Sequence, residues 1–195
     1  GTAADTTIAT LTEKETQILK GVPADPDIRL AVTLSRLFPS AGEESLRNTL
    51  QNLRPAKKFR THVLKLITGY SRFCAMELTP YAMRKLAGTM HFPDMERILD
   101  WYGAEGNVYG NTEMMRKHAE ASRLMDAIVT NGDPVFPSDL TIDGVDIRSA
   151  GIGGENGRQI GEALRLAYEW VLEDPEKNDR SFLLKRLKEH YDVPQ

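Results

Sequence analysis

The chain has 195 residues, of which 41% are hydrophobic and 27% charged, and its formal net charge is −3. This length accommodates one or two small domains with a hydrophobic core, and the composition is that of an ordinary globular protein. The sequence shows neither a signal peptide nor an apolar run long enough to span a membrane, and its only cysteine excludes an internal disulfide, so we expect a cytoplasmic protein.

Helix signals recur along the first half of the chain. Thr12 and Glu15 have the spacing of a capping box and predict a short helix that ends at Gly21. Asp25-Pro26 is typical of a helix start, and the apolar stripe that follows ends at Pro39. Two more helices are predicted from Glu43 and from Pro55. Their expected inward-facing residues are Leu46, Leu50 and Leu53 in the first and Phe59, Val63, Leu66, Ile67 and Tyr70 in the second.

The pattern continues through the middle of the chain. Thr79-Pro80 and Pro93 each predict a further helix start. The three glycines between Gly103 and Gly110 indicate a loop. A long helix is predicted from Thr112 to the breaker-rich run at 131–134. Its expected core-facing residues are Met115, Ala119, Met125, Ile128 and Val129.

The last third is organised around a glycine-rich turn at 151–157 that leads into a strongly periodic helix reaching Leu172. A last helix is predicted from Ser181 to Tyr191. The apolar face of the periodic helix is expected to consist of Ile160, Ala163, Leu164, Ala167, Tyr168, Val171 and Leu172. Strand-like alternation is absent from the sequence. We therefore predict an all-α fold, a multi-helix bundle body at 1–130 and a smaller helical tail at 131–195.

A basic segment is the clearest electrostatic feature of this mildly acidic chain. From Arg47 to Arg72 the sequence contains no Asp or Glu. Its candidate nucleic-acid contacts are Arg54, Lys57, Lys58, Arg60 and Lys65. Cations one helical turn apart match a run of phosphates. The alternative is a solvated helix face whose cations pair with acids of another element.

The tail supplies a second group of candidates. Backbone N–H groups at a helix start near Gly157 can hold an anion. Arg158 has Glu162 four residues later, so pairing within the helix competes with this role. Near the C-terminus, Lys185, Arg186 and Lys188 suit phosphate contact and suit compensation of the helix dipole equally.

No catalytic or metal-binding residue is predicted. The four histidines, His62, His91, His118 and His190, are scattered without the spacing of metal ligands. The two close carboxylate pairs have other interpretations: Asp25 and Asp27 indicate a helix cap, and Asp143 and Asp146 a turn. Cys74 lies in an apolar-leaning run and is expected to be a buried, inert thiol.

The last third also resembles a known family. From Phe136 to Leu187 the chain is similar to the C-terminal tail of bacterial tRNA nucleotidyltransferases (CCA-adding enzymes) and poly(A) polymerases. The matching segments are Phe136-Pro137, Asp139-Leu140, Asp143-Gly144-Val145-Asp146-Ile147, Gly151-Ile152, Gly157-Arg158-Gln159-Ile160-Gly161, Trp170-Val171-Leu172-Glu173-Asp174 and 178–184. Upstream, Ile28 to Val32 and Leu53 to Lys58 resemble the preceding helical region of that family more weakly.

The resemblance implies an RNA-binding, tRNA-holding C-terminal portion that grips RNA by its backbone and shape. The reaction of the parent enzyme is template-independent addition of CMP or AMP to RNA 3′ ends. Mg²⁺ and CTP or ATP are implied for a catalytic head whose motifs this sequence lacks, so no cofactor is expected in this chain. The implied partners are tRNA or another structured RNA and that head, and neither DNA nor a membrane is expected.

The same family includes proteins with a phosphohydrolase-like His-Asp pair in the helix that corresponds to residues 30–38. Here Thr33 to Leu37 reads Thr-Leu-Ser-Arg-Leu, so these metal ligands are missing and no phosphohydrolase activity is expected. The alternative function is a helical protein-interaction scaffold that does not bind RNA.

Overall fold

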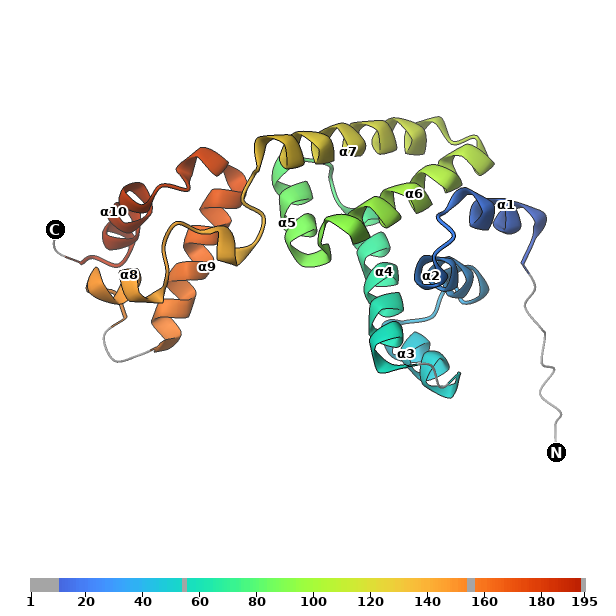
Figure 1. The fold of residues 1–195 in the computed structure, drawn as a ribbon, viewed down its shortest axis with the longest axis horizontal. Helices are drawn as coiled ribbons and strands as arrows, with labels where there is room; N and C mark the ends of the chain where they lie inside the picture. Colours follow the sequence, from blue (N-terminus) through green and yellow to red (C-terminus); the bar gives the residue numbers. More distant parts are fainter. Residues whose placement is uncertain (1–10, 54–55, 154–156, 194–195) are drawn as a thin grey trace. The chain divides into compact units, whose positions relative to one another are not determined.

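The computed structural model describes residues 11–53, 56–153 and 157–193. Throughout these ranges every regular element is a helix, which confirms the predicted all-α fold (Figure 1). None of the described helices is both long and apolar enough to cross a membrane.

Internal contacts divide the chain into two compact units. The first unit consists of residues 1–76 and 90–122, and the second of residues 77–89 and 123–195. Residues 77–89 and 123–130, which the sequence analysis assigned to the body, therefore group with the C-terminal unit.

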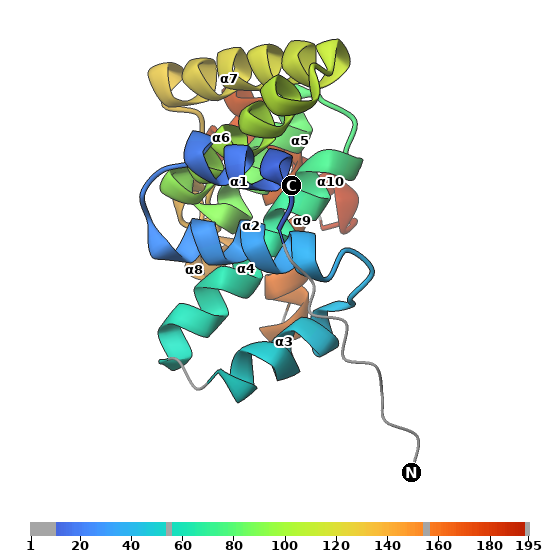
Figure 2. The same ribbon diagram turned by 90° about the vertical axis from the view of Figure 1, so that its right-hand side faces the viewer.

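Five helices and the start of a sixth build the first unit. They are α1 (Glu13–Gly21), α2 (Pro26–Leu37), α3 (Glu43–Asn52), α4 (Lys57–Ala75), α6 (Phe92–Tyr109) and the N-terminal part of α7 (Thr112–Asn131). Helix α4 packs against α2, α3 and α6, and α1 lies along α2 and α6 (Figure 2). Their shared core includes Ile18, Ile28, Val32, Leu50, Val63, Leu66 and Trp101.

Local signals explain where the first helices begin. The Thr12 side chain accepts a hydrogen bond from the Glu15 backbone, and Glu15 accepts one from Thr12 in return, so the predicted capping box is confirmed. Asp25 caps α2 by accepting from the Asp27 and Ile28 backbone N–H groups, with Pro26 in the first turn.

The loop predicted between Gly103 and Gly110 is wrong, because α6 continues through Tyr109. Two of its glycines are sites of close helix packing. A β carbon at Gly103 would lie 2.9 Å from the His118 ring of α7, and one at Gly106 would lie 3.3 Å from Met114. Only Gly110, with φ of +60°, acts as a helix terminator.

Several predicted core residues are exposed instead. Leu53 is 60% exposed because α3 ends one residue before it. In α7 the buried positions are Ala121, Leu124, Met125 and Ile128, which share one helix face. Met115, Ala119 and Val129, predicted to face the core, lie off that face and are exposed. Cys74 is also exposed, contrary to the prediction of a buried thiol.

The second unit is organised around α9. Its elements are most of α5 (Pro80–Met90), the end of α7, η1 (Pro137–Asp139), α8 (Gly144–Ser149), α9 (Gly157–Glu173), η2 (Pro175–Lys177) and α10 (Arg180–His190). Helix α9 contacts α8, α10, η1 and η2. The predicted apolar face of α9 is confirmed: its buried members are Ile160, Ala163, Ala167, Val171 and Leu172, and Leu164 and Tyr168 are partly buried.

The turn predicted at Asp143 and Asp146 is the start of a short helix. Asp143 accepts hydrogen bonds from the Val145 and Asp146 backbone N–H groups, and Asp146 accepts one from the Asp143 backbone. This reciprocal pair is a capping box, which holds α8 although the helix has only six residues. Ile147 of α8 is fully buried in the core of the second unit.

Candidate nucleic-acid interface

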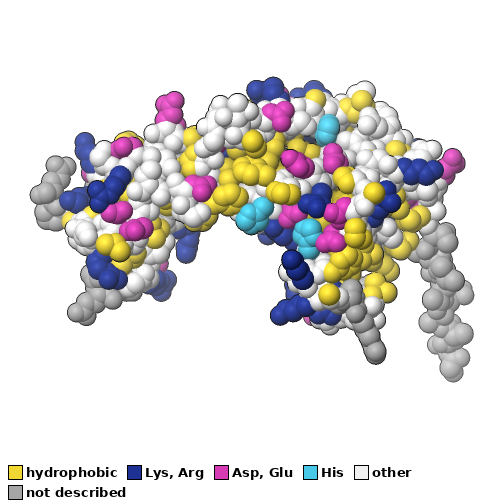
Figure 3. Space-filling model, viewed as in Figure 1, with side chains coloured by type: hydrophobic (Ala, Val, Ile, Leu, Met, Phe, Trp, Pro, Cys, Tyr) yellow, Lys and Arg dark blue, Asp and Glu magenta, His cyan; other side chains and the backbone are white. Residues whose placement is uncertain are grey.

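The N-terminal end of α4 carries the cations predicted from the basic segment. Lys57 and Lys58 are exposed in the first turn, and Arg60 is half-buried. Arg54 lies outside the described residues. Figure 3 shows Lys and Arg side chains gathered at this end of α4.

The electrostatics of this helix end are unfavourable as it stands. The N-cap residue, Ala56, offers no side-chain hydrogen bond, and the first turn contains no acidic residue. The free N–H groups and the helix dipole make this end positive, and helices normally place acidic residues there. Lys57 and Lys58 add positive charge instead, and among the described residues neither forms an ion pair. An anion bound here would relieve both the uncapped N–H groups and the repulsion between the cations.

Lys65 has a different environment from the other candidates on α4. Its ammonium group donates to the Met90 carbonyl at 2.8 Å and to the Asp94 carboxylate at 3.0 Å. The ammonium group of Lys65 is therefore engaged by partners within the first unit, although the side chain is 32% exposed, and Lys65 is not part of the interface proposed below.

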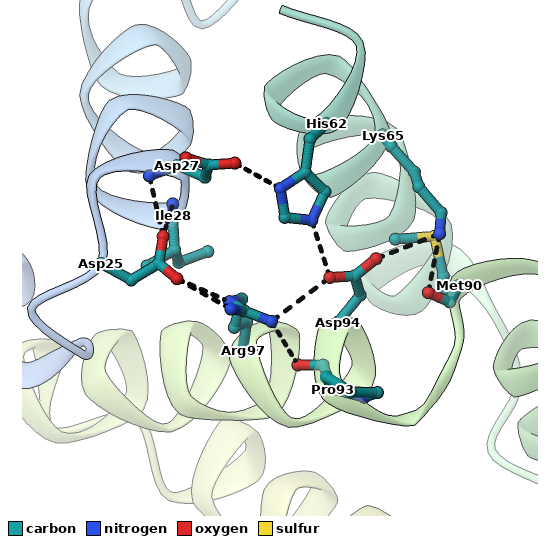
Figure 4. A network of polar contacts seen from close by, with 9 residues as sticks. All are labelled: Asp25, Asp27, Ile28, His62, Lys65, Met90, Pro93, Asp94 and Arg97. Carbon is teal, nitrogen blue, oxygen red and sulfur yellow. Dashed lines mark hydrogen bonds and ion pairs between the residues drawn. The ribbon is translucent and has the colours of Figure 1, made fainter. Parts of the chain in front are cut away.

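Lys65 belongs to a polar network that joins α2, α4 and α6 (Figure 4). The His62 ring bridges two carboxylates: Nδ1 contacts Asp27, and Nε2 lies 2.7 Å from Asp94 Oδ1. Arg97 closes the other side, donating to Asp25 at 2.8 Å and to Asp94 at 3.4 Å.

The charges of this network are balanced when His62 is protonated. Burial by itself lowers the pKa of His62, but the hydrogen bonds to Asp94 and Asp27 outweigh it and raise that pKa above its ordinary value. Both ring nitrogens face carboxylate oxygens, so both donate only in the imidazolium form. Three carboxylates then face three cations, which is the condition for keeping charges partly buried.

The carboxylates of the network respond in the opposite direction. Burial would raise the pKa of Asp94, yet His62 and Lys65 lower it overall. Burial would likewise raise the pKa of Asp25, but hydrogen bonds from Arg97 and from two backbone N–H groups lower it overall. The arrangement is thus a structural ion-pair network, with no feature of a carboxyl poised to donate a proton.

Sequence reasoning missed this network. It correctly identified Asp25 as a helix cap, but it treated His62 as one of four scattered histidines. The partners of His62 are 35 and 32 residues away in the chain, so no local spacing brings them together. Among the described residues, no group of three or more His, Cys, Asp or Glu side chains is arranged to hold a metal ion.

At the start of α9 the structure describes only part of the predicted glycine-rich turn, because residues 154–156 lie outside the described ranges. Gly151 and Gly153 have positive φ angles of 81° and 94°, as expected for this turn. Gly157 is exposed and begins α9. Arg158 is bonded to Glu162 at 3.0 Å, so the predicted pairing within the helix is confirmed.

Two cations of α10 share a cavity of about 450 Å³ in the second unit. Lys185 and Lys188 line it together with Arg180, Ser149 and Ser181. Arg180 is held by Asp146 at 2.5 Å. Neither lysine forms an ion pair with any described residue, and the Ser181 hydroxyl donates to Asp179, which leaves two ammonium groups and the Ser149 hydroxyl available to an anion.

Arg186 lies on a different side of α10. Its guanidinium lies 4.2 Å from the centre of the Trp170 ring and 5.9 Å from that of Phe182. This cation–π packing accounts for Arg186 structurally.

Comparison of the chain with protein-family models, with curated proteins and with solved structures gives no match. The interpretation of the two basic sites therefore depends on their geometry and on the sequence patterns described above.

Proposed function

We propose that this chain holds structured RNA, tRNA above all, as the body and tail of a tRNA nucleotidyltransferase or poly(A) polymerase-like protein. The observation that carries the proposal is the uncapped start of α4, where Lys57 and Lys58 reinforce a positive helix end that has no acid to balance it. A phosphate backbone supplies the missing negative charge without requiring any base sequence.

A second basic site supports the same function. The cavity lined by Lys185 and Lys188 brings together two ammonium groups that can contact phosphate oxygens. It lies in the region where the sequence resembles the family tail. In this proposal, nucleotide addition with its Mg²⁺ and CTP or ATP belongs to a catalytic head of the same kind of polypeptide, and the proposed location is the cytoplasm.

Binding of fluorescently labelled tRNA, followed by anisotropy, tests the proposal. Changing Lys57, Lys58 and Arg60 together to Gln is expected to weaken binding roughly 10-fold or more. Each lost phosphate contact should reduce the slope of log affinity against log salt by about 0.7–0.9. Binding that stays unchanged in affinity and in salt slope would exclude α4 from the interface.

The matched control is a triple Gln variant at Lys14, Lys20 and Arg116. These three cations are also exposed in the first unit, so the net charge changes equally. Lys14 follows the Thr12 cap of α1, Lys20 lies in the last turn of that helix and Arg116 pairs with Glu113, so none of the three lies at an uncapped helix start. If the control weakens binding as much as the α4 variant, the attraction is diffuse and the assigned site is wrong.

One observation favours the alternative, a protein-interaction scaffold. A cavity of about 530 Å³ in the second unit is lined mainly by apolar side chains, among them Leu140, Ile142 and Leu164. Incubation with tRNA and with candidate protein partners under the same conditions separates the two functions. A chain that retains a protein and shows no salt-sensitive tRNA binding would support the scaffold.

A further inference from the structure

A third cavity, of about 480 Å³, lies in the first unit, separate from the basic end of α4. Its walls come from α2, α4 and α6 and from the segment that leads into α3. The residues that matter for its chemistry are Ser35, Arg36, Tyr70, Cys74, Trp101 and Glu105. This volume lies within the range of pockets for small organic ligands.

Two buried polar atoms in the residues of one wall lack partners. The Arg36 Nη2 atom pairs with Glu105, which also accepts a hydrogen bond of 2.5 Å from Trp101 Nε1. Two other atoms of this wall, Arg36 Nε and Ser35 Oγ, are buried and make no hydrogen bond. Buried donors without partners are rare in folded proteins, and these two residues line the same cavity.

The other wall is aromatic. Tyr70 stacks on Trp101 with ring centres 3.8 Å apart and planes inclined by 11°. Tyr102 and Phe38 also line the cavity, and Phe38 is 41% exposed. Flat π surfaces of this kind favour a planar ring as ligand.

The charged residues of this cavity further restrict the class of ligand that it can bind. Glu105 is buried and neutralises Arg36, so this cavity carries no surplus positive charge for a phosphate. A purely apolar ligand would leave the Arg36 Nε–H and the Ser35 hydroxyl unsatisfied. The ligand that meets both conditions is flat, uncharged and carries ring or carbonyl acceptors at its edge.

We propose that this cavity binds a nucleobase. An acceptor on the base edge receives the Arg36 Nε–H bond, the Ser35 hydroxyl bonds a neighbouring edge atom, and the ring face lies against the aromatic wall. The base comes either from a free nucleoside or from an unpaired nucleotide of RNA. The RNA case depends on the proposed function, and the nucleoside case does not.

Fluorescence of Trp101 gives the first test. The chain has two tryptophans, so a Trp170→Phe variant leaves Trp101 as the only one. Adenosine, cytidine, guanosine and uridine are titrated separately, with ribose as the control. We expect saturable quenching by at least one nucleoside, with a dissociation constant on the order of 0.1–1 mM.

Two variants connect the signal to the polar wall. Arg36→Lys keeps the charge opposite Glu105 but removes the Nε–H donor, and Ser35→Ala removes only the hydroxyl. Losses of about 10-fold and about 3-fold in affinity are expected. If Arg36→Lys fails to fold, the Ser35→Ala variant and the alkylation of Cys74 still test whether the cavity binds a nucleobase.

Cys74 provides an independent reporter because it lines the cavity, is exposed and is the only cysteine. Saturating nucleoside at about ten times its dissociation constant should slow alkylation of this thiol about 10-fold. Conversely, protein alkylated with a bulky maleimide should no longer quench.

The arms of the experiment separate the two sources of the base. Protection of Cys74 by free nucleoside assigns the cavity to nucleosides. Protection only by a single-stranded oligonucleotide, lost with its abasic counterpart, assigns it to an unpaired RNA base. Quenching that persists after alkylation, or no protection in either arm, overturns the proposal, whatever the outcome of the tRNA titration.

Discussion

The imidazole of His62 lies between α2 and α6, with its Nε2 atom 2.7 Å from Asp94 Oδ1 and its opposite nitrogen against Asp27. Helix α4 is thereby fastened to both neighbours through one titratable ring. The stability of the first unit should consequently depend on pH in a way that the sequence of α4 alone does not suggest.

We predict that the first unit is most stable in mild acid. The pKa of His62 is raised, so its contribution is complete below about pH 6.5 and is lost as the pH rises through the folded-state value. The pKa values of Asp94 and Asp25 are lowered, so their contribution is complete above about pH 4 and is lost as the pH falls further. Urea unfolding followed through Trp101 in the Trp170→Phe background measures this. A midpoint that rises steadily from about pH 5.5 to about pH 8.5 would contradict it.

A second prediction concerns His62→Gln. Gln has one neutral donor nitrogen where the imidazolium has two charged ones facing opposite carboxylates, so the free energy of unfolding should fall by about 1–3 kcal/mol at about pH 5.5. At about pH 8.5 the difference from the parent protein should be smaller, because the parent has then lost its charged ring. The control is His190→Gln, since His190 is exposed in the second unit. Equal losses at both pH values would show that the charge of His62 is irrelevant.

The Lys65→Gln variant is expected to lose stability while it keeps its affinity for tRNA. Lys65 bonds to Asp94 and to the Met90 carbonyl, so its loss should lower the free energy of unfolding by about 1 kcal/mol. Because the side chain is held internally, tRNA affinity should change less than about 2-fold. Lys58→Gln should show the reverse pattern. A loss of affinity for Lys65→Gln that matches Lys58→Gln would return Lys65 to the interface.

Gly88→Ala should destabilise the second unit. A β carbon at Gly88 would lie 2.1 Å from the Val135 carbonyl oxygen and 2.6 Å from the Tyr168 hydroxyl, which donates to that same carbonyl. Since backbone must move, the expected cost is about 1–3 kcal/mol. Gly161→Ala is the matched control: no atom lies within 4 Å of its β carbon, and α9 should gain up to about 1 kcal/mol. Thermal melts of the two variants should shift in opposite directions.

The cap of α8 gives a final prediction. Asp143→Ala removes the acceptor for two backbone N–H groups and should cost about 1 kcal/mol, whereas Asp143→Asn should cost only a few tenths. Amide hydrogen exchange at Ile147 reports the loss locally. Identical exchange in the two variants would show that the capping box does not hold α8.

The sequence predicts helix starts well where one residue type performs one local task. Asp25 before Pro26, and Thr12 before Glu15, form the expected caps because each bond closes within three residues. Asp143 and Asp146 form a cap of the same kind, although the sequence analysis predicted a turn at this pair. Gly103 was misinterpreted for a different reason: glycine indicates a loop only when nothing packs on its bare face.

The candidate sites show the same contrast between local features, which the sequence reveals, and contacts between distant residues, which it does not. The charge of the α4 start follows directly from Lys57 and Lys58, because helix position and charge are both local properties. The sequence reveals neither the ion pair between Lys65 and Asp94 nor the unsatisfied Nε–H of Arg36. Both depend on which helices meet, and the residues involved are distant in the chain.

The contact between Gly103 and His118 restricts how this protein can vary. With only 2.9 Å between a β carbon at 103 and the imidazole, neither position is free to change by itself in the direction of greater bulk. A methyl group at position 103 fits without a steric clash only when position 118 carries a smaller side chain, so the two positions should change together. Relatives of this chain should therefore show correlated substitution at these two sites, even though neither lies in a proposed binding site.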